Sequence, residues 1–156
     1  MQYFAIISRE GSHILAEFPD CPGCQTFADT DHIGEAAREA LEGWLESHLE
    51  LGRVPPRPVK HTTSPADTRL VPIGIRPGLA AALQVRWARS DAGLTQGALG
   101  KKAGVSQQQI AKLEDPDVNP SLETLDKVAR ALGLDLTVGL EPAPSVSPPP
   151  RRRRAG

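Results

Sequence analysis

This chain of 156 residues has no long apolar run, only two cysteines and a net charge close to zero. No apolar run approaches the roughly 18 residues needed to cross a bilayer, and the first residues lack the basic region and cleavage site of an export signal. We therefore expect a soluble, cytoplasmic protein without membrane contact. The two cysteines, Cys21 and Cys24, lie too close together to staple a secreted domain.

The formal net charge of −1 hides an uneven distribution along the chain. Residues 1–58 contain four Lys or Arg and ten Asp or Glu, a net charge of −6, whereas residues 59–156 carry +5. A chain of this length forms one ordinary domain or two small ones. The charge split favours two modules that bind partners of opposite sign.

Alternating strand patterns dominate the first module. The predicted strands are residues 2–8, 13–18, 25–28 and 70–75. Pro72 makes the last of them an edge or irregular strand, because proline lacks the donor that a central strand needs. Apolar residues spaced three and four apart over 33–49 predict an amphipathic helix, with Thr30 or Asp31 as its cap. The predicted order is β-β-β-α-β.

Helical spacing dominates the second module. The predicted helices are residues 79–91, 96–103, 107–114 and 122–132. The run 135–140 alternates like a strand, and we consider it a candidate dimer contact. The Pro- and Arg-rich residues 141–156 cannot bury apolar area, so we expect a disordered tail there.

Residues 95–114, TQGALGKKAGVSQQQIAKLE, have the spacing of a helix-turn-helix. Gly104 suits the sharp turn between two short helices, and Ser106 suits the cap of the second. The second helix then exposes Gln107, Gln108 and Gln109 in its first turn. Such amides pair with adenine edges or bind phosphate.

This segment resembles the Cro and lambda-repressor (Xre) type of helix-turn-helix, and the likeness continues to residue 134. The resemblance implies that Gln96 contacts phosphate while Gln107 and Gln108 enter the major groove of a palindromic operator bound by a dimer. Gly97 and Gly100 depart from the larger helix formers common in that family, at about 1 kcal/mol each relative to Ala. A bundle without DNA function is the alternative, and the polar glutamines disfavour it. The predicted DNA-binding residues are Thr95, Gln96, Ser106, Gln107, Gln108, Gln109 and Lys112.

The Cys21-Pro22-Gly23-Cys24 segment allows three interpretations. A redox motif belongs at a helix N-terminus, but here a strand follows. A structural zinc site needs four ligands, and the chain has no second CxxC. We predict a tight turn, with neither metal nor cofactor.

The order β-β-β-α-β looks like a truncated ribonuclease H fold, whose chemistry needs several carboxylates around two metal ions. The inward residues of the first strand are either Phe4 and Ile6 or Ala5 and Ile7, and none is acidic. The last strand contains no acid either. The sequence therefore predicts that the chain is not an enzyme.

The segments YFA at 3–5, FPDCPGC at 18–24, ALEGWL at 40–45 and RVPPRP at 53–58 together resemble the HicB antitoxin family over residues 1–75. Cys21 stands where that family usually has an aliphatic residue. The resemblance implies a degenerate, partial ribonuclease H-like domain that covers a HicA toxin, a small basic mRNA interferase. The toxin contacts predicted around the turn are Phe18, Asp20, Pro22, Gly23, Cys24 and Asp29.

We predict an α+β toxin-binding domain at 1–75, an all-α helix-turn-helix domain at 76–140 and the tail at 141–156. The predicted function is an antitoxin that also represses its own operon as a homodimer or a higher even-numbered oligomer. The alternative is a stand-alone repressor whose first domain senses a small molecule or mediates oligomerisation.

Overall fold

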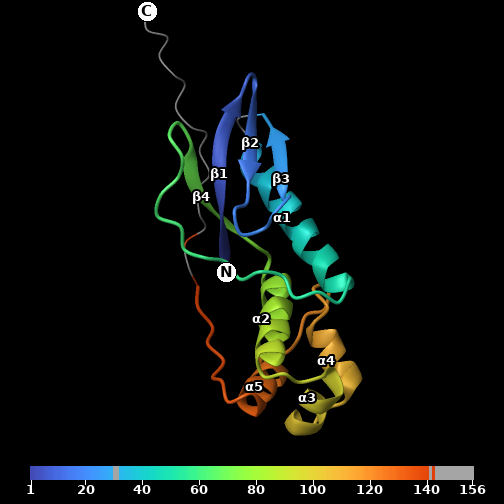
Figure 1. Ribbon diagram of the computed structural model, residues 1–156. Helices are drawn as coiled ribbons and strands as arrows, with labels where there is room; N and C mark the ends of the chain where they lie inside the picture. The colour runs from blue at the N-terminus through green and yellow to red at the C-terminus, as the bar shows by residue number, and fades with distance from the viewer. Residues whose placement is uncertain (30–31, 141, 143–156) are drawn as a thin grey trace, which may run out of the picture. The chain divides into compact units, whose positions relative to one another are not determined.

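The structure is a computed structural model that describes residues 1–29, 32–140 and 142. The described residues form two compact units (Figure 1). The first contains residues 1–44 and 56–75, and the second contains 45–55 together with 76–140 and 142. The predicted cap at Thr30 or Asp31 and the predicted disordered tail fall outside the described residues, residue 142 excepted.

The first unit is built on a four-stranded sheet with the order β3-β2-β1-β4. Its strands are β1 (Gln2–Glu10), β2 (His13–Glu17), β3 (Gln25–Ala28) and β4 (Arg69–Gly74). All three pairings are antiparallel, and β4 lies at an edge, as Pro72 predicted. The predicted β-β-β-α-β order is confirmed.

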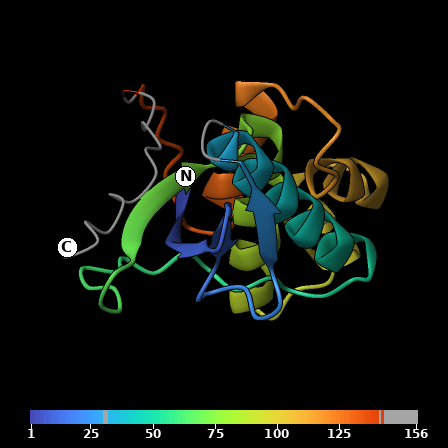
Figure 2. The same ribbon diagram turned by 90° about the horizontal axis from the view of Figure 1, so that it is seen from above.

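The helix that follows β3 covers one face of this sheet (Figures 1 and 2). The helix α1 (Ile33–Glu50) follows β3, and its apolar stripe is buried, as are the alternate residues of β1. The largest fully buried side chains of this unit are Tyr3, Ile7, Ile14, Ile33, Leu41 and Ile73. Of the two possible inward sets on β1, Ala5 and Ile7 face the core.

The second unit contains the end of α1, from residue 45, and four further helices among its described residues. They are α2 (Pro77–Asp91), α3 (Gln96–Ala103), α4 (Gln107–Leu113) and α5 (Leu122–Ala131). These bounds agree with the sequence prediction to within two residues. A single apolar cluster joins the helices: Val85, Leu99, Ala103, Ile110, Leu113 and Val128.

The predicted strand at 135–140 is wrong, because the described chain has no strand in this segment. A strand exists only with a hydrogen-bonding neighbour, and the described residues supply none for it. Its apolar side chains Val138 and Leu140 are exposed, as is the preceding Leu134. Alternation alone therefore did not indicate secondary structure here.

None of the helices in the described ranges is long and apolar enough to cross a membrane.

Candidate functional site

The two helices α3 and α4 form a helix-turn-helix whose ends are set by local side chains. The Thr95 hydroxyl accepts a hydrogen bond from the backbone N–H of Ala98 at 3.1 Å and caps α3. Gly104 ends α3 in the left-handed region, with φ of +68°, where a side chain would be strained. Ser106 then caps α4. The predicted roles of Gly104 and Ser106 are confirmed.

The Ser106 cap is a reciprocal capping box. Its hydroxyl accepts from the backbone N–H of Gln109 at 3.1 Å, and the Gln109 side-chain oxygen accepts from the backbone N–H of Ser106 at 2.8 Å. The Gln109 oxygen is therefore engaged within α4. Gln107 and Gln108 are exposed. Neither side chain forms a hydrogen bond with the described residues.

Lysines flank these glutamines on the same two helices. Lys101, Lys102 and Lys112 are exposed. Exposed lysines beside exposed amides are the combination that binds phosphate and base edges together.

The turn between α3 and α4 leaves no room for a side chain at position 100. A Cβ on Gly100 would lie 2.8 Å from the backbone oxygen of Val105 and 3.2 Å from the carbonyl group of Ser106. A Cβ on Gly97 would meet side chains alone, namely Gln107 at 3.5 Å and the Thr95 hydroxyl at 4.0 Å. The two glycines that depart from the family's larger helix formers therefore differ, since only the absent side chain of Gly100 lets α3 approach the backbone at the start of α4.

We expect the two alanine substitutions to act in opposite directions. Gly100→Ala forces the turn away from α3 and should lower the free energy of unfolding by about 1 to 3 kcal/mol. Gly97→Ala meets no backbone atom and should raise it by up to about 1 kcal/mol, because glycine is a poor helix former. Urea denaturation of both variants tests this. Equal effects of the two substitutions would contradict the close approach at Gly100.

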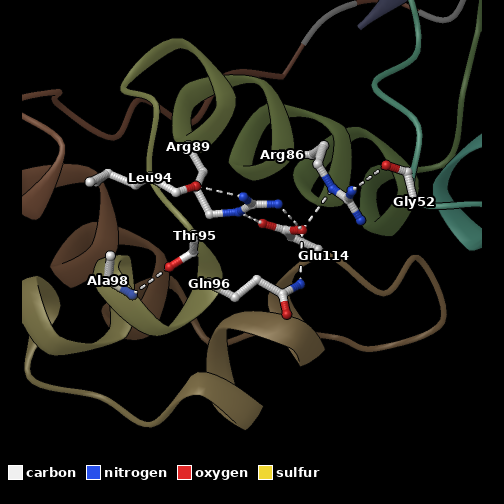
Figure 3. Close-up of polar contacts among 8 residues, drawn as sticks. All are labelled: Gly52, Arg86, Arg89, Leu94, Thr95, Gln96, Ala98 and Glu114. Carbon is white, nitrogen blue, oxygen red and sulfur yellow. Dashed lines mark hydrogen bonds and ion pairs between the residues drawn. The ribbon is translucent and has the colours of Figure 1, made fainter.

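A buried carboxylate lies between the helices of the second unit (Figure 3). Glu114 is 4% exposed and follows α4 directly. The Arg89 guanidinium donates to both of its oxygens, with Nη2 at 2.9 Å from Oε2. Arg86 Nε forms an ion pair with Oε2 at 2.7 Å, although its N–H is not aligned for a hydrogen bond. The hydrogen bond to Glu114 raises the pKa of Arg89 above its ordinary value.

This carboxylate also orients Gln96 at the start of α3. The Gln96 amide nitrogen donates to Glu114 Oε2 at 3.1 Å (Figure 3). An amide nitrogen carries two hydrogens, so one remains for another acceptor. The sequence pattern did not indicate Glu114, because its partners Arg86 and Arg89 are distant along the chain.

The predicted turn at 18–24 is confirmed in the first unit. Backbone N–H groups of Phe18, Cys21 and Cys24 are all hydrogen-bonded within the turn. Gly23 has a φ of +82°, as expected for that position. The turn is therefore held by its own backbone.

The six predicted toxin contacts lie in different environments. Phe18 and Cys24 are buried. The Asp20 carboxylate accepts from the backbone N–H of Val59 at 2.9 Å and lies 2.8 Å from His61 Nε2, so it holds the loop after α1. The exposed members are Pro22, Gly23 and Asp29.

Both cysteines of the turn are buried and are free thiols, not a disulfide. Burial raises the pKa of Cys21 to about 12 and that of Cys24 to about 11. Reactive redox thiols have a lowered pKa, so this environment favours a structural role. The part of the chain that the structure describes has no cluster of His, Cys, Asp or Glu suited to a metal ion.

These pKa values predict slow alkylation of the native thiols. A raised pKa keeps each thiol protonated until the pH rises toward that value, and only the thiolate reacts. At pH 8, iodoacetamide should modify native Cys21 and Cys24 more than about 100-fold more slowly than the same thiols in urea. Mass spectrometry of the alkylated peptides measures the rate for each thiol in the native protein and in urea. Equal rates in the two states would contradict the burial.

An open groove of about 460 Å³ lies between α1 and β4 in the first unit. It is lined by Glu35, Arg38, Glu39 and Glu42 and by the β4 segment 72–74. Its lining is largely charged, so it lacks the apolar surface typical of small-molecule sites.

The fold and the α3–α4 geometry define a helix-turn-helix DNA-binding protein with an N-terminal α+β unit. A helix-turn-helix family profile matches residues 85–138. The chain is also 30% identical over 134 residues to Antitoxin HicB 1 of Photorhabdus laumondii subsp. laumondii, covering 85% of this chain and 81% of the relative. This chain belongs to the HicB antitoxin family.

A chain of a solved HicA3 and HicB3 toxin-antitoxin complex matches 49% of this chain and 100% of its own length, with 26% identity and a TM-score of 0.44. HicB antitoxins are not enzymes, which confirms the prediction made from the missing inward acids.

Proposed function

We propose that this chain neutralises a HicA-type mRNA interferase through residues 1–75 and represses its own operon through residues 76–140. The observation that carries the DNA half is the capped α3–α4 pair, which exposes Gln107 and Gln108. The net charge of −6 on residues 1–58 carries the toxin half, because an RNA-cleaving toxin needs a basic surface. We place both activities in the cytoplasm.

We propose that this chain inhibits the toxin by covering its RNA-binding surface and not by a chemical reaction. A bound antitoxin domain denies messenger RNA access to the basic toxin surface. Around the 18–24 turn, Pro22, Gly23 and Asp29 supply the exposed contacts, while Phe18, Asp20 and Cys24 hold the turn in shape. The relative from Photorhabdus laumondii bears the name of an antitoxin, which supports this role.

On the DNA side, Gln107 and Gln108 read base edges, and Lys112 with the backbone N–H groups at the start of α3 binds phosphate. Gln96 donates its remaining amide hydrogen to a phosphate. Thr95, Ser106 and Gln109 keep the two helix starts in register through their caps. A dimer would present two such helices to successive major grooves.

We propose that the segment 135–140 joins two copies, since its side chains Val138 and Leu140 are 69% and 100% exposed. Deleting residues 135–140 should convert a dimer to a monomer in light scattering. A deletion variant that remains dimeric would contradict this contact.

Co-expression tests the main proposal. We expect a small basic toxin to be encoded beside this chain. It should arrest growth when expressed alone, and co-expression of this chain should relieve the arrest and yield a co-purifying complex. Unrelieved arrest would refute the antitoxin role and leave a stand-alone repressor. Metal-dependent RNA cleavage by this chain alone would instead favour a nuclease.

A further inference from the structure

The strand register divides the sheet of the first unit into two unlike faces. Tyr3 pairs with Ile73, and Ala5 with Val71, so these buried side chains share the core face. Paired residues in an antiparallel ladder point to the same side of the sheet, and neighbours along a strand point to opposite sides. The remaining strand residues therefore form a second face, here called the open face.

The centre of the open face is apolar. Ile6 pairs with Leu70, Phe4 with Pro72, and Leu15 with Phe27. Leu15 is buried among its neighbours, four of these side chains are partly exposed, and Phe27 is 55% exposed. A sheet face turned permanently to solvent is ordinarily polar. The Phe4 ring packs edge-on against the His61 ring of the loop after α1, with centroids 6.1 Å apart. The rest of the apolar centre still crosses all four strands, at Leu70, Ile6, Leu15 and Phe27, which indicates a surface that another molecule covers.

The charges of the open face have one sign. Among the strand residues, all of which the structure describes, its charged members are Glu10 and Glu17. Arg9 and Arg69 pair with Ile14 and Ile7, so they belong to the core face. An apolar centre with acidic residues at its margin complements a partner with an apolar centre and a basic margin.

The β3 edge makes one side of the open face more accessible. Residues 25–28 form an edge of the sheet in the described part of the chain, without proline, and Phe27 lies on this edge strand. The opposite edge strand contains Pro72, which lacks a backbone donor. Aromatic side chains, phenylalanine among them, are enriched in protein interfaces relative to the rest of the surface. Phe27 is thus the expected anchor.

We propose that the open face beside β3, centred on Phe27, is the surface on which the small basic toxin docks. This inference rests on the proposed antitoxin function. The acidic face of α1 offers charge around its groove, but its apolar residues are turned into the core. The open face offers both apolar area and complementary charge.

A second copy of this chain is the less suitable occupant. Two open faces placed together would bring four glutamates into one interface with no lysine or arginine from the strands. Like charges at an interface oppose association, whereas a basic partner relieves them.

The experiment compares two charge-altering variants by calorimetric titration with the small basic protein encoded beside this chain. Phe27→Lys should weaken binding at least tenfold, while Glu39→Lys, in the groove of α1, should weaken it less than threefold. Phe27→Ala, which adds no charge, should weaken binding by an intermediate factor. In a Trp87→Phe background, the Trp44 fluorescence of every variant during urea denaturation should match that of the wild type, which shows that the first unit remains folded.

The outcomes separate the two proposals. A wild-type chain that does not bind the basic protein refutes the antitoxin function and this inference with it. Wild-type binding that Phe27→Lys leaves unchanged, or that Glu39→Lys weakens more, overturns the open face alone. A lower oligomeric state of Phe27→Lys in light scattering, without weaker toxin binding, would assign the face to a second copy.

Discussion

Glu114→Ala should lower the free energy of unfolding of the second unit by about 3 to 5 kcal/mol. The substitution leaves the Arg86 and Arg89 side chains, which are 12% and 13% exposed, without their carboxylate. Removing one partner of a buried ion pair strands the remaining charge in a poorly solvated site, which costs more than the pair contributes. Since a domain has a total stability of only about 5 to 15 kcal/mol, the effect is large.

The measurement can be confined to the second unit because each unit contains one tryptophan. Trp87 is buried in α2 and donates to the Pro55 carbonyl at 2.7 Å, while Trp44 belongs to the first unit. In a Trp44→Phe background, fluorescence during urea denaturation therefore reports on the second unit. The midpoint should fall sharply with Glu114→Ala.

Asp126→Ala provides the matched control. It also removes a carboxylate from an arginine pair, at 2.8 Å from Arg130, but both of these side chains face solvent. Water replaces the lost partner at an exposed site, so the midpoint should hardly move. Equal midpoints for Glu114→Ala and Asp126→Ala would show that the buried network does not stabilise the unit.

The sequence was most informative where structure is decided locally. The bounds of α3 and α4 follow from Thr95, Ser106 and Gly104, whose capping and turn preferences act within four residues. Pro72 likewise indicated an edge strand through its own missing donor. In each case the cause and the effect lie within the same short segment.

Features that depend on distant neighbours were not predictable. Both alternating residue sets of β1 are apolar, so the pattern could not say which faces the core. The requirement for Gly100 comes from the carbonyl groups of Val105 and Ser106, and the role of Glu114 comes from arginines about 25 residues earlier. The strand expected at 135–140 failed for the same reason, because no neighbour was present to pair with it.

The second large effect is expected in operator binding. Gln107→Ala and Gln108→Ala should each weaken binding by about 1 to 3 kcal/mol, or roughly five- to 150-fold, because each removes a bidentate donor and acceptor from the major groove. Fluorescence anisotropy with a duplex from the region upstream of the gene, at one stated salt concentration, measures the loss. Unchanged affinity for both variants would refute this assignment.

Two further glutamines serve as controls. Gln84→Ala makes the same chemical change on α2, where the side chain is exposed and hydrogen-bonds to the Ala80 carbonyl at 3.4 Å. Its operator affinity should be that of the wild type. Gln109→Ala removes half of the Ser106 capping box, so it should lower the free energy of unfolding by about 1 kcal/mol. Its operator affinity at 25 °C should change less than that of Gln107→Ala.

A scrambled duplex distinguishes base contacts from phosphate contacts. Phosphate binding by Lys101, Lys102 and Lys112 does not depend on sequence, so the glutamine variants should keep their affinity for scrambled DNA while losing affinity for the operator. The ratio of the two affinities therefore falls. If both affinities fall by the same factor, Gln107 and Gln108 bind the DNA backbone, and sequence specificity must come from other residues of the α3–α4 surface.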